Sequence, residues 1–201
     1  KHFSAGADLN WMKRMSNCSQ EENLKDASML TTMLQKLNNL KYPTLAVTKG
    51  AAFGGGVGLI SCCDIALASE NSIFSLSEVK VGLVPATISP YVINAIGARN
   101  ARRLFTSGER FDSNIAKQIN LVHEIAKEED LEKRISYFIN HFEQNGPQAV
   151  IAAKKIVLDI FDKEIDDSVI SHTCEVISSL RTSKEGREGV TAFLEKRNPN
   201  W

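Results

Sequence analysis

Residues 50–63 read GAAFGGGVGLISCC, and the fold is decided here. The glycine triplet Gly54–Gly56 lets the backbone approach another group closely, because no Cβ restricts its dihedral angles. The small and apolar run 57–63 that follows is typical of a buried helix. The first amides of such a helix lack partners within the helix and carry partial positive charge. They therefore favour an anion, including an oxyanion that exists only during a reaction.

The stretches on either side of the triplet alternate between strand and helix patterns. Residues 43–48 are partly β-branched and predict a buried strand that ends just before the glycines. Residues 64–68 and 72–76 predict two more strands. A capping-box pattern at 19–22 opens a helix predicted over about 20–40. This alternation predicts an α/β fold with crossover connections.

The second half of the chain is mostly helical in its pattern. Apolar residues recur there at helical spacing, and only 121–125 resembles a strand. We therefore expect an α/β core at 1–125 and a helical region at 126–201. Such helices would cover the core or pack against other subunits.

Composition excludes several classes of function. The 24 Lys and Arg residues balance the 24 Asp and Glu residues, so the chain has no net charge. No overall positive potential therefore attracts nucleic acid or an anionic membrane. The most apolar stretch, 51–68, contains Asp64 and several glycines, which does not suit a membrane-spanning helix. The cysteines lack zinc-site spacing, and no metal is expected.

Common nucleotide and hydrolase motifs are missing as well. The glycines around 50–56 do not fit the dinucleotide fingerprint G-x-G-x-x-G, and no lysine follows as a phosphate-binding loop requires. No serine stands in a G-x-S-x-G context, which disfavours a serine hydrolase.

Three places could carry chemistry, and each also has a plain structural interpretation. The tetrapeptide 5–8, AGAD, could bring backbone close to a ligand or could be a tight turn capped by Asp8. Glu78 follows a strand, where it could form an ion pair with Lys80 or, half-buried, exchange protons near neutral pH. The basic end of the last helix, 193–197, could be solvated or could contact a phosphate.

Taken together, these pieces strongly resemble the crotonase family of enoyl-CoA hydratases and isomerases. The similarity rests on FSAGADL at 3–9, GAAFGGG at 50–56, CDIA at 63–66, SEV at 77–79 and GLVP at 82–85. It continues through TSGERF at 106–111 and NLV at 120–122 to AFLEKR at 192–197.

The resemblance implies a spiral of β-β-α units with a helical C-terminal trimerisation region. It also implies that an N-terminal part of the fold, with much of the CoA-binding loop, is missing from this chain. The catalytic roles that it implies are an oxyanion hole from the Ala7 and Gly55 amides and acid/base catalysis by Glu78. Substrate contacts are implied for Ala5, Asp8, Leu9, Gly54, Gly58, Pro85, Phe193 and Lys196, with Lys196 near a CoA phosphate.

Two departures from the family pattern bear on the reaction. Gly58 replaces the first of the two glutamates used by typical hydratases, and PATISP at 85–90 replaces a glycine-rich loop. A lone glutamate could hydrate a short or branched 2-enoyl-CoA or could move its double bond. A non-catalytic acyl-CoA binder is a further alternative. Gly58 is also expected to leave volume for a branched or carboxylated acyl group.

Some loops point to a narrower group within the family. DLNWM at 8–12, GVGL at 56–59 and VPATISPY at 84–91 are similar to the methylglutaconyl-CoA and carboxygeranoyl-CoA hydratases of leucine and acyclic terpene breakdown. The resemblance further implies a homotrimer or a hexamer built as a dimer of trimers. It implies no cofactor, since coenzyme A is part of the substrate, and a location in the cytoplasm, or in the mitochondrial matrix of a eukaryote.

Overall fold

The computed structural model describes residues 1–201, which form two compact units. The first unit comprises Lys1–Leu40 and Thr44–Glu132, and the second comprises Lys41–Pro43 and Lys133–Trp201. The roles expected for 1–125 and 126–201 stay predictions.

Two three-stranded sheets form the centre of the first unit. One is parallel throughout and contains β1 (Leu45–Thr48), β3 (Ile65–Ser69) and β6 (Glu124–Ala126). In the other, β4 (Ile73–Ser75) pairs in parallel with β2 (Ala51–Phe53) and antiparallel with β5 (Arg110–Asp112). The mixture of parallel strands and crossover helices is the α/β arrangement that the sequence predicts.

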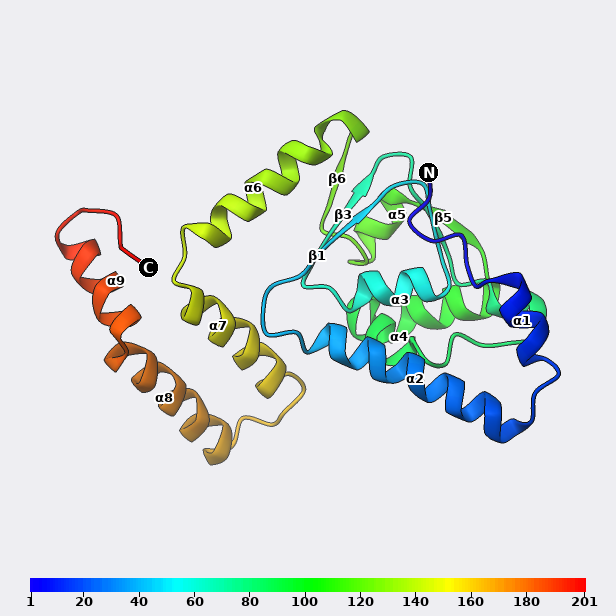
Figure 1. Cartoon of the computed structure of the whole chain (residues 1–201), viewed down its shortest axis with the longest axis horizontal. Helices are drawn as coiled ribbons and strands as arrows, with labels where there is room; N and C mark the ends of the chain where they lie inside the picture. The colour runs from blue at the N-terminus through cyan, green and yellow to red at the C-terminus, as the bar shows by residue number, and fades with distance from the viewer. The chain divides into compact units, whose positions relative to one another are not determined.

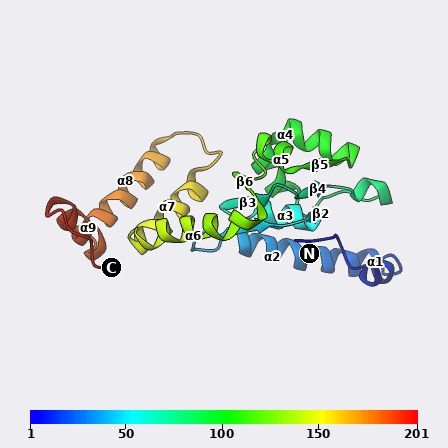
Figure 2. The ribbon, with the colours of Figure 1, turned by 90° about the horizontal axis from the view of Figure 1, so that it is seen from above.

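The first unit also contains helices. They are α1 (Leu9–Met15), α2 (Gln20–Asn38), α3 (Gly55–Ser61), α4 (Ser89–Ser107, interrupted at Gly97) and α5 (Ser113–Gln118), with 3₁₀ turns η1 (Glu78–Val81) and η2 (Glu128–Asp130). Helix α3 contacts both α2 and α4 (Figure 1), and it lies between them when the unit is seen from above (Figure 2). It is therefore buried, as its small and apolar sequence predicts.

The capping box expected at the start of α2 is confirmed. The Ser19 hydroxyl accepts from the Glu22 amide at 3.2 Å, while the Glu22 carboxylate accepts from the Ser19 amide at 2.8 Å. Strands β1, β3, β4 and β6 also lie where the sequence predicts them, within a few residues. Strands β2 and β5, of three residues each, were not predicted.

The hydrophobic core belongs to the first unit. Leu34 of α2, Ile60 of α3 and Phe74 of β4 are almost completely buried. The Phe74 ring stacks on that of Phe111, with centroids 5.6 Å apart, so the β4–β5 pair is joined by side chains as well as by hydrogen bonds. This core holds β4 firmly, and β4 leads directly to Glu78.

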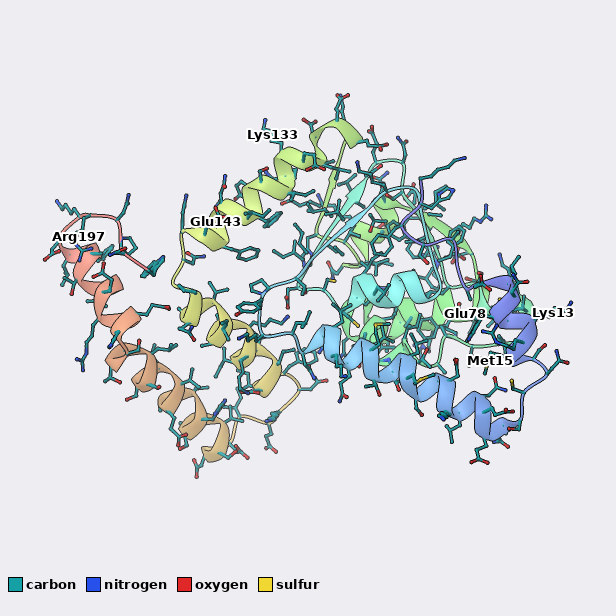
Figure 3. The ribbon with its side chains drawn as sticks, viewed as in Figure 1. Lys13, Met15, Glu78, Lys133, Glu143 and Arg197 are labelled. Carbon is teal, nitrogen blue, oxygen red and sulfur yellow. The ribbon has the colours of Figure 1, made fainter.

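The second unit contains α6 (Leu131–Glu143), which starts in the first unit, α7 (Pro147–Ile160), α8 (Asp167–Thr182) and α9 (Lys184–Leu194). Glu185 of α9 accepts hydrogen bonds from the amides of Gln148 and Ala149 at the start of α7. Arg197, labelled in Figure 3, contacts the carboxylates of Glu188 at 2.6 Å and Glu195 at 2.7 Å. These polar contacts tie α7, α9 and the C-terminal residues together.

No helix in the structure combines the length and the apolar character that crossing a bilayer requires.

Asp64, between α3 and β3, fixes the start of the parallel sheet. Its Oδ2 accepts from the amide of Thr44 at 2.7 Å and from the Thr44 hydroxyl at 2.9 Å, while the Asp64 amide donates to that hydroxyl at 3.0 Å. We expect Thr44→Ala to lower the free energy of unfolding by about 1 kcal/mol, because two of these bonds are lost. Thr44→Ser keeps the hydroxyl and is the matched control in urea unfolding. Equal losses in the two variants would contradict this role of the hydroxyl.

Candidate active site

Glu78 is delivered to its place by strand β4 and a tight turn. The strand ends at Ser75, Leu76 is fully buried, and Glu78 is the first residue of η1. The carbonyl of Glu78 accepts from the Leu83 amide at 3.0 Å, which closes the turn around Gly82. Gly82 has a φ of 76°, so its left-handed conformation suits glycine. This hydrogen bond and the Gly82 conformation thus fix the backbone around Glu78.

The carboxyl group of Glu78 lies against the glycine triplet. A Cβ on Gly54 would stand 3.0 Å from Oε1 of Glu78, so a side chain there would press on the carboxyl group. The other oxygen, Oε2, is buried and has no hydrogen-bond partner. Burial is the main cause that raises the pKa of Glu78 above its usual value. Figure 3 labels this residue within the first unit.

The alternative that Glu78 forms an ion pair with Lys80 is wrong. The carboxyl oxygen Oε2 has no partner, and the Lys80 side chain passes close to Gly108, where a Cβ would lie 3.2 Å from its Cε. A buried carboxyl group without a cation holds its proton more tightly than one in water. Glu78 therefore has the environment of a proton-transferring group rather than of a structural ion pair.

The glycine triplet is joined to the same strand as Glu78. The amide of Gly54 donates to the carbonyl of Ser75 at 2.9 Å, and Gly54 adopts φ 53° and ψ −117°. Such a conformation strains any residue with a Cβ. Helix α3 then begins at Gly55, which is exposed and has no side-chain cap before it. The Gly55 amide, the first of the helix, thus faces outward with partial positive charge.

The N-terminal segment reaches the same place through strand β2. The Ser4 amide donates to the Ala51 carbonyl at 2.9 Å, and the Ser4 carbonyl accepts from the Phe53 amide at 3.0 Å. A Cβ on Gly56 would lie only 2.7 Å from the Ser4 Cβ, so this close approach requires glycine. Ala7 follows three residues later, within about 10 Å of chain. The segment that carries Ala7 therefore begins beside the start of α3.

The Ala7 amide forms no hydrogen bond within the chain, and Ala7 is exposed. Gly6 before it has a φ of 110°. The Asp8 carboxylate accepts from the Trp11 amide at 2.7 Å and caps α1, so the interpretation of Asp8 as a local cap is confirmed. Ala5 and Leu9 are both exposed at this end of the unit. Their roles toward a substrate stay predictions.

Gly58 corrects one expectation. It was expected to leave volume for an acyl group, but a Cβ there would lie 2.2 Å from Cγ2 and 2.7 Å from Cβ of Ile88. Gly58 is buried, Ile88 is only 2% exposed, and Pro85 of the same loop is buried too. The space beside Gly58 is therefore filled by protein. Ile88 was not singled out by the sequence, since nothing in it reveals a contact across 30 positions.

Phe193 and Lys196 belong to the second unit. Phe193 lies on α9 and is 82% exposed, and Lys196 follows the helix with a φ of 54°. The structure brings Glu78, Gly54 and Gly55 together in the first unit, with the segment that carries Ala7 beginning beside them. The roles expected for Phe193 and Lys196 at that site stay predictions.

Comparisons with known proteins identify the family of this chain. The sequence profile described as enoyl-CoA hydratase/isomerase matches residues 1–201. A crystal structure of an enoyl-CoA hydratase from Shewanella pealeana superposes with a TM-score of 0.96 at 45% identity, covering 100% of this chain and 75% of that one. The chain therefore belongs to the enoyl-CoA hydratase/isomerase family, and its α/β core has the crotonase fold.

Relatives within the family differ in their named reactions. A putative enoyl-CoA hydratase of Thermus thermophilus is 28% identical over 100% of this chain and 79% of its own length. A mitochondrial Delta(3,5)-Delta(2,4)-dienoyl-CoA isomerase of Dictyostelium discoideum is 31% identical over 99% of this chain and 71% of its own length. Family membership therefore does not decide between hydration and isomerisation, and the choice must be argued from the geometry of the site.

The buried carboxyl group of Glu78 should make the free energy of unfolding depend on pH. Its pKa lies above the usual 4.5 in the folded state. Below that pH both states hold the proton. As pH rises, the unfolded state loses its proton first and the folded state is disfavoured. We therefore expect Glu78→Gln to be more stable than the wild type between pH 7 and 8.

This difference between Glu78→Gln and the wild type should vanish as the pH falls toward 4.5. Denaturant unfolding at a series of pH values measures it. Glu70→Gln, at an exposed position, removes the same charge and is the control. A difference that stays constant with pH would show that ionisation of Glu78 does not cause it.

Proposed function

We propose that the chain is an enoyl-CoA hydratase that adds water to a short or branched 2-enoyl-CoA thioester. The observation that carries the proposal is the carboxyl group of Glu78, with one oxygen over Gly54 and the other buried without a partner. A group of this kind can take up and return a proton near neutral pH. It lies beside a helix start whose first amide can stabilise negative charge.

In the proposed reaction the thioester carbonyl oxygen accepts hydrogen bonds from the amides of Ala7 and Gly55. Glu78 removes a proton from water while the water oxygen bonds to the β-carbon, and the double-bond electrons move onto the carbonyl oxygen as an enolate. Glu78 then returns the proton to the α-carbon, so one water is added in total. An oxyanion donor of this kind is typically worth about 3 kcal/mol.

Further parts of the substrate would contact the remaining predicted residues. In this proposal Ala5, Asp8, Leu9 and Pro85 line the path of the acyl-CoA. Phe193 covers it, and Lys196 contacts a CoA phosphate, of the same subunit or a neighbouring one. Coenzyme A enters as part of the substrate, and the proposal needs no separate cofactor.

Motifs in two loops support a narrower proposal, hydration of methylglutaconyl-CoA or carboxygeranoyl-CoA. The observed packing limits where the carboxylate of such a substrate would bind. It does not fit beside Gly58, because Ile88 occupies that space. A panel of thioesters that includes a branched dicarboxylic member tests the narrower proposal, and failure with that member alone would remove it.

The helices of the second unit support the proposal of a homotrimer or a dimer of trimers. Helices α7 and α8 and the connection between them expose large apolar side chains that a lone subunit would leave in water, among them Val157, Phe161, Ile165 and Ile170. Light scattering after size exclusion measures the oligomer, and a monomer at micromolar concentration would refute it.

Double-bond isomerisation is the second candidate. The observation that favours it is the missing second carboxylate, since position 58 is a buried glycine packed on Ile88. One glutamate can move a proton between two carbons of a bound dienolate without any water. The site is chemically sufficient for this reaction as well.

Glu78→Gln should lower kcat at least about 100-fold, because an amide cannot transfer the proton. Acyl-CoA binding, measured by calorimetry, should stay within a few-fold of the wild type, since the amide has nearly the same shape. Glu70→Gln should keep full activity. Full turnover by Glu78→Gln would refute the assignment of this residue.

Water containing heavy oxygen separates the two candidate reactions. We expect a 2-enoyl-CoA to yield a 3-hydroxyacyl-CoA that carries the label, because the added oxygen comes from water. A 3-enoyl-CoA converted to its 2-enoyl isomer without label would favour the isomerase instead. Saturable binding with no change in any thioester would favour a non-catalytic acyl-CoA binder. Mass spectrometry of the products distinguishes all three.

A further inference from the structure

Gly58 and Ile88 are in direct contact, although 30 positions separate them. An added Cβ on Gly58 would meet Cγ2 of Ile88 at 2.2 Å, its Cβ at 2.7 Å and its Cδ1 at 3.7 Å. Distances below 3.0 Å force a displacement. Position 58 can therefore carry a side chain only if Ile88 moves or becomes smaller.

Ile88 has little freedom to move. It caps α4, where its carbonyl accepts from the Val92 amide at 3.1 Å. The Ser89 amide donates to the Ala86 carbonyl at 3.1 Å, which closes the turn around Ile88. The side chain is 2% exposed and belongs to the main core. A larger residue at position 58 would thus disturb a close-packed interior.

Glu78 and Ile88 both belong to the segment 78–88. Glu78 lies against Gly54 before α3, and Ile88 lies against Gly58, one helical turn further along. The Gly58 amide approaches the Gly54 carbonyl at 3.4 Å, as in a helical turn. Glu78 lies over Gly54, and Ile88 packs against Gly58. A carboxylate attached at position 58 would therefore start one helical turn from the carboxyl group of Glu78.

We propose that Ile88 is a positioning residue that sets the reaction by keeping position 58 free of any side chain. The inference rests on the proposed function and deepens it. The site holds one carboxyl group because Ile88 occupies the volume that a second one needs. A single proton-transferring group must then take the proton from the incoming water and return it to the α-carbon.

The packing part of this proposal is tested by a stability cycle. Gly58→Ala should lower the thermal midpoint by roughly 5 °C, because the added methyl group overpacks the core. Gly55→Ala is the matched control, since a Cβ there meets nothing within 4 Å, and it should not lower the midpoint.

Substitutions at Ile88 should relieve the overlap in a graded way. Ile88→Gly removes every overlapping atom, so Gly58→Ala should cost little in that background. Ile88→Ala keeps the Cβ at 2.7 Å and should relieve it partly. Ile88→Val loses only the Cδ1 atom at 3.7 Å and should give no relief. Additive effects across the cycle, or a Gly58→Ala variant as stable as the wild type, would overturn the packing part.

The chemical part is tested by placing an acid at position 58. The double variant Gly58→Glu with Ile88→Gly is compared with Gly58→Gln with Ile88→Gly, which has the same size without the charge. We expect the ratio of labelled hydration product to double-bond migration to be at least about 10-fold higher in the glutamate variant, because a second acid/base group can share the proton transfers. Equal ratios would overturn it.

The two parts fail in distinguishable ways. Lack of any turnover by the wild-type protein on enoyl-CoA thioesters would refute the proposed function, and with it the chemical part. The stability cycle uses no substrate and would still decide whether Ile88 excludes a side chain from position 58.

Discussion

The hydrogen bond from the Gly54 amide to the Ser75 carbonyl, 2.9 Å long, joins the two halves of the site. On one side of it the chain turns into α3 and directs the Gly55 amide outward. On the other side β4 ends, and Glu78 follows within three residues. Phe74 and Leu76 on either side of Ser75 are fully buried, so this junction is anchored in the core. The separation between the Glu78 carboxyl group and the Gly55 amide is therefore set by a junction that is buried in the core.

Two unusual features meet at this junction. Gly54 adopts a positive φ, and Oε2 of Glu78 is buried without a partner. The unpartnered oxygen costs stability, of the order of 1 kcal/mol or more, whereas the Gly54 conformation is tolerated because this residue has no Cβ. Elsewhere in the first unit the caps and strand pairs follow the local preferences of the sequence, as in the capping box of α2. Departures from local preference that gather at one place are typical of a functional site, because a carboxyl group with good partners would be a poor proton carrier.

Prediction from the sequence succeeded where a pattern repeats within a short stretch. Helix α2 and strands β1, β3 and β4 have clear periodicity or β-branched runs. Because a strand was predicted over 72–76, Glu78 was correctly expected just after the end of a strand. Strand β2 was missed because its three residues lie between Gly50 and Gly54, which dominate the local pattern. The contact of Gly58 with Ile88 could not be predicted, since it depends on how α3 packs against the start of α4. Sequence alone therefore suggested empty volume where the structure has an isoleucine.

That contact also joins two features that look independent in the sequence. Gly58 and the loop 85–90 are two separate features of the sequence, and the structure shows that Ile88 of the loop fills the space that the glycine leaves. Replacing Gly58 alone would overpack the core, whereas replacing Ile88 alone would open a cavity; each change is unfavourable without the other. The two positions are therefore coupled in their effect on stability. In this chain, an acid at position 58 would require a smaller residue at position 88 or a differently placed loop, so the number of carboxyl groups that the site can hold is linked to the conformation of the segment that follows Glu78.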